Sequence, residues 1–220
     1  MFQYVLFDLD GTLTDPKVGI TSCVQYALAD AGIQEPDLDK LEPFIGPPLS
    51  DSFREFYGFN DEQIKRAIDK YHERFDQKGI FENEIIEGIP ELLKALKDAG
   101  RRVSIASSKP RPLVIRILEH FEIAQYFDTV VGSEYDGRFA TKEAVVEEAL
   151  GQLVPSVYEK EDVAMVGDRK FDIQGAKAHG LTGIGVSFGY AGEHELEDAG
   201  ADYIVDTIEE LQRLLLQGSL

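Results

Sequence analysis

The sequence predicts an α/β fold: a Rossmann-like doubly wound parallel sheet with a small all-helical cap domain inserted into it. From about residue 88 onward, short segments rich in Val, Ile and Leu alternate with amphipathic helical segments. Such alternation is typical of a parallel sheet with helices on both faces. An apolar run near the N-terminus is separated from this region by a stretch with helical patterns and no convincing strand. We therefore expect a core over 1–15 and 83–220, a helical cap domain over 16–82, and hinges near 13–17 and 79–87.

The first half of the chain shows its elements through apolar spacing and helix-start signals. Residues 2–7 form an apolar run that predicts a strand buried on both faces. A capping-box-like start, Asn60 to Gln63, begins the third helix of the insert. Two prolines predict a rigid loop over 44–49, and a short helical turn is expected over 35–41. Apolar residues recur at helical spacing over 16–31, 49–57 and 60–79.

The same signals order the rest of the chain. Prolines begin helices at 90 and 110, and threonines cap helices at 141 and 207. Two further helices are expected over 171–179 and 193–199. Apolar runs rich in β-branched residues predict strands over 103–106, 127–131, 163–166, 181–186 and 203–205.

The composition limits the partners of the protein. The chain has 220 residues, with 22 Lys and Arg against 41 Asp and Glu, and a formal net charge of −19. Such a field repels phosphate backbones, so we expect no nucleic acid polymer as a partner. No apolar run of about 18 residues predicts a membrane span, and no basic stretch predicts a signal peptide. The single cysteine, Cys23, excludes an intrachain disulfide and fits a cytoplasmic location. A monomer and a homodimer both stay open.

Two aspartates at the end of the first predicted strand are the strongest chemical signal. Asp8 and Asp10 follow the apolar run directly, and Gly11 comes next. Ligands of open α/β sheets bind beyond the carboxyl ends of the strands, so carboxylates there indicate chemistry. We interpret Asp8 as a nucleophile and Asp10 as its acid/base partner. The alternative is a solvated turn, because Asp-Gly pairs are common turn formers.

Other predicted strands end in polar side chains at the same edge of the sheet. Ser107 follows the second strand, Asp168 follows a later one with Asp172 four residues on, and Lys142 lies early in a helix. Three of these residues have an alternative interpretation, whereas Asp168 is harder to explain in another way. Ser107 can start a helix, Lys142 can be solvated, and Asp172 can favour the positive end of its helix. The convergence of all four on one edge predicts a site.

The charges of this site predict a divalent cation. Two carboxylates about 4 Å apart repel each other by about 4 kcal/mol at an effective dielectric constant of about 20. Asp8, Asp168 and Asp172 would therefore repel one another. Ligation by a few carboxylates, with water and phosphate oxygens completing the shell, is typical of Mg²⁺. No His or Cys stands at zinc-ligand spacing, so the predicted cofactor is Mg²⁺.

These groups together predict phosphoryl transfer. Asp8 can attack phosphorus and form an aspartyl-phosphate. Asp10 can protonate the leaving oxygen and then activate water. Ser107 and nearby backbone N–H groups can hold phosphoryl oxygens, and Lys142 can neutralise them. The expected substrate is a small phosphorylated metabolite.

Over its whole length, the sequence resembles the haloacid dehalogenase-like hydrolase superfamily. Four motifs of that superfamily are matched in order by Asp8-Leu-Asp10-Gly-Thr-Leu-Thr14, Ile105-Ala-Ser107-Ser, Lys142 and Gly167-Asp168-Arg-Lys-Phe-Asp172. The helical insert is similar to the cap of members that carry one between the first two motifs. Phe44-Ile-Gly-Pro-Pro-Leu49, Ala-Thr-Lys-Glu around Lys142, and Gly189-Tyr190 look like the phosphoglycolate phosphatase-like branch, whose members include nucleotidases. Glu143 departs from the commoner Lys-Pro pattern of the third motif.

The resemblance implies roles for the matching residues. Asp8 would be the nucleophile and a metal ligand, and Asp10 would be the acid/base and offer its backbone carbonyl to Mg²⁺. Asp168 would be the third protein ligand, and Asp172 would bind the metal directly or through water. Gly46 and its prolines fall where such caps carry a specificity loop, and Arg54 has a solvated helix arginine as its alternative. The predicted substrate contacts are Thr12, Ser108, Gly46, Pro47 and Arg54.

Several activities stay open beside a Mg²⁺-dependent phosphomonoester phosphatase. A phosphosugar mutase would use phosphorylated Asp8 to rephosphorylate its product. A phosphate-dependent binding protein is the non-enzymatic alternative, although a binder has no need for both aspartates. Asp10 argues against a dehalogenase, because displacing halide needs no acid at that position. Phosphonate hydrolysis needs a lysine of the cap at the site, and the sequence places none there.

Overall fold

The computed structural model describes residues 2–134, 138–154 and 158–218. The chain divides into two compact units. The first unit consists of Met1–Thr14 and Ile85–Leu220, and the second is the segment Asp15–Glu84 between them. None of the helices in the described part of the chain is both long and apolar enough to cross a membrane. That the second unit serves as a cap stays a prediction.

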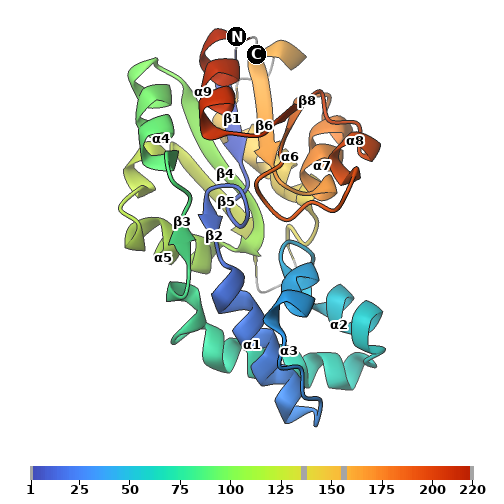
Figure 1. Ribbon diagram of the computed structural model, residues 1–220. Helices are drawn as coiled ribbons and strands as arrows, with labels where there is room; N and C mark the ends of the chain where they lie inside the picture. The colour runs from blue at the N-terminus through green and yellow to red at the C-terminus, as the bar shows by residue number, and fades with distance from the viewer. Residues whose placement is uncertain (1, 135–137, 155–157, 219–220) are drawn as a thin grey trace. The chain divides into compact units, whose positions relative to one another are not determined.

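A six-stranded sheet forms the centre of the first unit (Figure 1). Its strands lie in the order β5-β4-β1-β6-β7-β8, and every neighbouring pair is parallel. The predicted doubly wound parallel sheet is therefore confirmed. The strands are β1 (Tyr4–Phe7), β4 (Arg102–Pro110), β5 (Thr129–Ser133), β6 (Val163–Gly167), β7 (Thr182–Val186) and β8 (Tyr203–Val205).

Helices cover both faces of this sheet. In Figure 1, α6 and α7 lie on one face, and α4 and α5 lie on the other. The predicted threonine caps are present: Thr141 accepts from the Ala144 N–H at 3.3 Å, and Thr207 accepts from the Glu210 N–H at 3.1 Å. The helices are α4 (Ile89–Asp98), α5 (Arg111–His120), η3 (Ala124–Tyr126), α6 (Lys142–Leu153), η4 (Lys160–Asp162), α7 (Lys170–Ala178), α8 (Glu195–Asp198) and α9 (Ile208–Gln217).

Strand β1 is buried on both faces, as its apolar run predicts. Val5, Leu6 and Phe7 have no exposed surface. Leu6 belongs to a core cluster with Met165 of β6 and Val146 of α6. Full burial of such side chains contributes roughly 1.5–3 kcal/mol each. This packing fixes the carboxyl end of β1, where Asp8 follows.

The second unit is a helical insert with its own core. An aromatic cluster contributes to this core, where Phe44 meets Phe53 edge to face with ring centroids 5.0 Å apart. The predicted capping box is present, because Asn60 and Gln63 each accept the other's backbone N–H at 3.0 Å. The helices are α1 (Lys17–Asp30), η1 (Leu38–Phe44), α2 (Leu49–Tyr57), α3 (Asp61–Phe75) and η2 (Gly79–Phe81).

Two short strands stand where the sequence predicts only hinges. β2 (Thr14–Asp15) and β3 (Glu84–Ile85) pair into a separate two-stranded sheet. The backbone N–H of Ile86 also donates to the Leu13 carbonyl at 3.1 Å. Strands of two residues are too short to carry a periodic pattern, which is why the sequence does not predict them. The chain thus enters and leaves the insert through paired segments.

Candidate active site

The turn after β1 places two aspartates at the edge of the sheet. The Asp8 N–H continues the ladder by donating to the Val166 carbonyl at 2.9 Å. The chain then reverses, and the N–H groups of residues 12, 13 and 14 all donate to the Leu9 carbonyl. Gly11 has φ +79°, and a Cβ there would lie 2.1 Å from Asp168 Oδ2. Only glycine combines this backbone with this close approach.

Three buried carboxylates converge beyond adjacent strands β1 and β6. Asp8 follows β1, Asp168 follows β6, and Asp172 lies in the first turn of α7. One oxygen from each residue lies within 4.8 Å of the others. Asp8 is 6% exposed, whereas Asp168 and Asp172 have no exposed surface. The sheet order changes direction between these two strands, where α/β folds bind ligands.

Lys142 lies between two of these carboxylates. Its ammonium is 2.9 Å from Asp8 Oδ1 and 2.7 Å from Asp172 Oδ1, and it donates to the Ala106 carbonyl at 3.0 Å. Burial disfavours the charged lysine, but the two carboxylates outweigh it and raise the Lys142 pKa. The alternative of a solvated lysine is therefore wrong, since the residue is only 7% exposed.

Asp168 and Asp172 are held by backbone and hydroxyl donors. Asp168 Oδ2 accepts from the Tyr190 N–H at 2.7 Å, and its Oδ1 accepts from the Thr12 hydroxyl at 3.3 Å. Burial, followed by the charges of Asp172 and Asp8, raises the pKa of Asp168 well above its usual range. Asp172 Oδ2 accepts from the Arg169 N–H at 3.0 Å. Burial raises the Asp172 pKa to about 6, although Lys142 favours the charged form.

This carboxylate cluster suits a divalent cation. Among the described residues, Asp8 Oδ1 and Asp172 Oδ1 have no hydrogen-bond donor apart from the Lys142 ammonium. One lysine leaves the charge of the three carboxylates only partly compensated. Hard divalent cations, which prefer oxygen ligands, match such a donor set. The three residues therefore fit the metal site that the sequence predicts.

Asp10 pairs with a lysine to which sequence reasoning assigns no role. The Lys109 ammonium contacts Asp10 Oδ2, and both side chains are about nine-tenths buried. Asp10 Oδ1 is buried and has no hydrogen-bond partner in the part of the chain that the structure describes. Burial raises the Asp10 pKa even though the Lys109 charge works against this. The signal in the sequence is a lysine two residues after Ser107, at the same edge of the sheet.

The other predicted contacts of the first unit also lie on this edge. Ser107 is 2% exposed, and its hydroxyl accepts from the Lys109 N–H at 3.3 Å. The alternative interpretation, that Ser107 starts a helix, is wrong because strand β4 continues to Pro110. The Ser108 carbonyl accepts from the Ser133 hydroxyl at 2.8 Å. Thr12 is fully buried, and its hydroxyl donates to Asp168 Oδ1.

Three predicted substrate contacts belong to the second unit. Gly46 has φ +105° in the loop before α2, and Pro47 follows it. Arg54 of α2 lies 2.8 Å from Asp61 and 3.8 Å from Asp51, with a side chain 54% exposed. This pairing is the one expected of a solvated helix arginine. The roles of these residues toward a substrate stay predictions.

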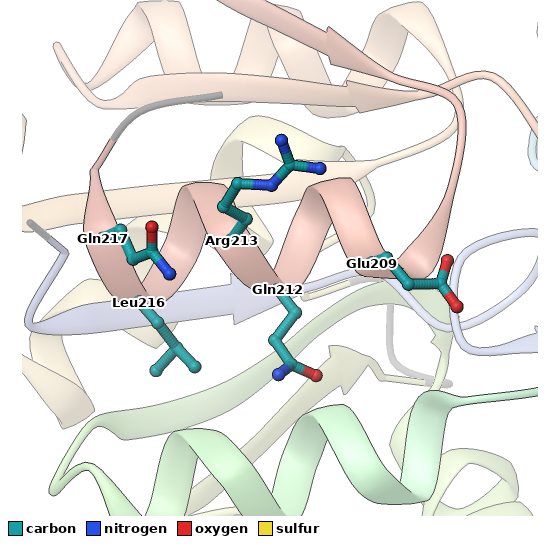
Figure 2. Close-up of a pocket in the computed structure, with 5 residues that line it drawn as sticks. All are labelled: Glu209, Gln212, Arg213, Leu216 and Gln217. Atoms are coloured by element: carbon teal, nitrogen blue, oxygen red, sulfur yellow. The ribbon is translucent and has the colours of Figure 1, made fainter.

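A surface pocket of about 230 Å³ lies along helix α9 (Figure 2). Each described residue that lines it belongs to this helix, and none of the predicted site residues is among them. The residues that line it are Glu209, Gln212, Arg213, Leu216 and Gln217. The candidate active site is therefore the carboxylate cluster and not this pocket.

The family model of the haloacid dehalogenase-like hydrolases matches residues 5–186. The chain belongs to this family. The match runs from β1 to β7 and so covers the carboxylate cluster, Asp10, Ser107 and Lys142. The family resemblance predicted from four short motifs is therefore confirmed.

Similar proteins narrow the class of this haloacid dehalogenase-like hydrolase. A 5'-nucleotidase of Pseudomonas aeruginosa is 45% identical over 195 residues, which cover 89% of this chain and 87% of that relative. The crystal structure of a predicted phosphatase from Clostridium acetobutylicum has a TM-score of 0.92 and 46% identity, and covers 99% of both chains. Tyrosine-protein kinase PtkA of Mycobacterium tuberculosis is 38% identical over 216 residues, 97% of this chain and 72% of the relative. The chain is a phosphatase of the haloacid dehalogenase-like family.

Proposed function

We propose that the protein is a Mg²⁺-dependent phosphomonoester phosphatase that acts on a small cytoplasmic metabolite through an aspartyl-phosphate. The buried cluster of Asp8, Asp168 and Asp172 carries this proposal. Asp8 and Asp168 would hold the cation with their side chains, and Asp10 with its backbone carbonyl. Asp172 would bind it directly or through water. The bound cation would offset the clustered negative charge and polarise the phosphoryl oxygens.

Asp8 and Asp10 divide the covalent chemistry. The Asp8 carboxylate attacks phosphorus, so an oxygen–phosphorus bond forms on Asp8 while the bond to the substrate alcohol breaks. Asp10 gives its proton to the departing oxygen, a role that its raised pKa supports. Asp10 then takes a proton from water as that water attacks phosphorus. Asp8 leaves as a carboxylate, and inorganic phosphate is released.

The remaining residues hold the phosphoryl group and its partners. Lys142 keeps Asp8 in place and neutralises charge, as its two short ion pairs indicate. Ser107 and neighbouring backbone N–H groups bind phosphoryl oxygens, with Ser108 and Thr12 beside them. Lys109 pairs with Asp10 Oδ2, which leaves the buried Oδ1 to meet the leaving oxygen. Gly46, Pro47 and Arg54 supply the proposed contacts to the rest of the substrate.

Nucleoside 5'-monophosphates are the first substrates to test, because a 5'-nucleotidase is 45% identical to this chain. Phosphoglycolate comes second, because of the branch that the motifs resemble. A phosphate-release assay over nucleoside monophosphates, phosphoglycolate and sugar phosphates, with Mg²⁺ and with EDTA, tests both. We expect release that depends on Mg²⁺. An isomerised sugar phosphate without phosphate release would instead favour the mutase, and bound but unchanged ligand would favour a binding protein.

The covalent role of Asp8 is tested by Asp8→Asn. We expect turnover to fall by at least about 10³, because the amide cannot serve as the nucleophile. Asp69→Asn, at an exposed position of α3, is the matched control and should leave turnover unchanged. Ordinary turnover in Asp8→Asn would remove Asp8 from the mechanism.

A further inference from the structure

Glu195, the first residue of α8, ties two backbone segments together. Its Oε1 accepts from the Lys170 N–H at 2.8 Å, and its Oε2 accepts from the Gly192 N–H at 3.0 Å. The Arg169 guanidinium donates to Oε1 at 2.9 Å. The side chains of Arg169 and Glu195 are only 12% and 14% exposed. One carboxylate thus joins the start of α7 to the loop of residues 189–192.

Each of these two segments donates a backbone hydrogen bond to the carboxylate cluster. At the start of α7, the Arg169 N–H donates to Asp172 Oδ2 at 3.0 Å. In the loop, the Tyr190 N–H donates to Asp168 Oδ2 at 2.7 Å. A Cβ at Gly189 would lie 2.3 Å from the Asp168 Cβ, so the loop backbone lies directly against Asp168. A shift of either segment would therefore move a carboxylate of the cluster.

The backbone just before Glu195 is strained. His194 has φ +59°, a left-handed backbone conformation that a residue with a Cβ rarely adopts. Such conformations persist where surrounding contacts over-determine them, and they concentrate at functional sites. Burial disfavours ionised Glu195, but Arg169 and the N–H donors of Lys170 and Gly192 outweigh it and lower the Glu195 pKa. Glu195 is thus an anion whose contacts hold this strained segment.

We propose that Glu195 is a positioning residue that sets the affinity of the Asp8, Asp168 and Asp172 cluster for its divalent cation. It acts by holding the loop of residues 189–192 and the start of α7 in the arrangement that orients the carboxylates of Asp168 and Asp172 toward the cation. Glu195 itself touches neither substrate nor cation. This inference rests on the proposed function of the cluster as a cation site.

Asp202 provides a matched control for Glu195. Its Oδ2 accepts from the Gly183 N–H at 2.8 Å, and its Oδ1 accepts from the Lys177 ammonium at 2.9 Å. Like Glu195, it joins α7 to a neighbouring segment through one cation and one backbone N–H. Neither Gly183 nor Lys177 has a hydrogen bond to the cluster among the contacts of the described residues. Asp202→Asn therefore weakens a tie of the same kind, by removing its charge, without moving a carboxylate.

The experiment measures binding of Mn²⁺ alone by electron paramagnetic resonance to the full chain and its variants. We expect Glu195→Ala to weaken Mn²⁺ binding by about tenfold or more. Glu195→Gln should weaken it less, because the amide oxygen still accepts one N–H but no longer attracts Arg169 as an anion. Asp202→Asn should bind as the wild type does. In the phosphatase assay, the Mg²⁺ concentration for half-maximal rate should rise in the Glu195 variants, while the rate at saturating Mg²⁺ stays near wild type.

The outcomes separate this inference from the proposed function. Wild-type affinity for Mn²⁺ in Glu195→Gln and Glu195→Ala overturns the role of Glu195 alone. Equal loss of affinity in Asp202→Asn overturns it too, because the effect would then be general destabilisation. If Glu195→Ala does not fold, the comparison of Glu195→Gln with Asp202→Asn decides. Wild-type protein that neither binds Mn²⁺ nor responds to Mg²⁺ overturns the cation site itself, and the role of Glu195 with it.

Discussion

Replacing Lys142 with methionine tests how far one buried ammonium stabilises the cluster. At the observed 2.9 and 2.7 Å, Coulomb's law gives an attraction of about 6 kcal/mol for each pair at an effective dielectric constant of about 20. Methionine has a similar length but carries no charge. The variant therefore avoids the desolvation cost of burying lysine, and this gain offsets much of the lost attraction. Breaking a buried pair by removing one partner costs about 3–5 kcal/mol. We expect Lys142→Met to lose this amount of unfolding free energy.

Thermal unfolding in EDTA measures the loss. For a chain of this size, about 1 kcal/mol shifts the Tm by about 2–4 °C, so we expect a drop of about 6–20 °C. Added Mg²⁺ should narrow the Tm difference between the variant and the wild type. A ligand at 100 times its Kd stabilises the folded protein by about 2.7 kcal/mol, and the variant has more uncompensated charge for the cation to neutralise. Lower pH should narrow this Tm difference as well, because Asp168 and Asp172, whose pKa values burial raises, take up protons.

Lys177→Met is the matched control for Lys142→Met. Lys177 pairs with Asp202 at 2.9 Å, but the lysine side chain is 38% exposed. Partly exposed pairs of this kind contribute about 0.2–1 kcal/mol. Equal Tm values for Lys142→Met and Lys177→Met in EDTA would refute the claim that the Lys142 pairs are buried and stabilising.

Three further predictions follow from particular contacts. Asp10→Asn should reduce turnover by about 10²–10⁴ and let phosphorylated protein accumulate from substrates with good leaving groups; mass spectrometry that finds none would contradict this. Gly11→Ala should destabilise the protein more than Gly100→Ala in urea unfolding. A Cβ at Gly11 would lie 2.1 Å from Asp168 Oδ2, whereas a Cβ at Gly100 would have no atom of the described residues beyond its chain neighbours within 4 Å. Equal losses of unfolding free energy would refute the close packing at Gly11. Burial disfavours ionised Asp128, but the Lys97 ammonium and the Val103 N–H outweigh it and lower the Asp128 pKa. The difference in unfolding free energy between wild type and Asp128→Asn should therefore have its full size above the ordinary Asp pKa and disappear as the pH falls through the lowered Asp128 pKa. Unfolding measured over a pH series tests this. A free-energy difference that is independent of pH would contradict the prediction.

Local signals explain why so much of the fold was predictable. The apolar run before Asp8 predicts a strand buried on both faces, and β1 is one. Thr141, Thr207 and the Asn60 capping box predict helix starts, and each accepts the expected backbone N–H. These features depend on residues a few positions apart, so they are present in the sequence itself. The two-residue strands β2 and β3 are too short for such a pattern.

The order of the chemical groups was likewise a property of the sequence, and their contacts were not. Alternating strands and helices predict that Asp8, Ser107 and Asp168 share one edge of a sheet, because parallel strands end on the same side. Only the tertiary structure decides that Lys142 is buried between Asp8 and Asp172, and that Lys109 pairs with Asp10. These contacts join residues far apart in the chain, and they depend on the order in which the strands lie side by side. The hydroxyl of Thr12 reaches Asp168 across 156 positions of sequence, a separation at which periodicity and capping carry no information.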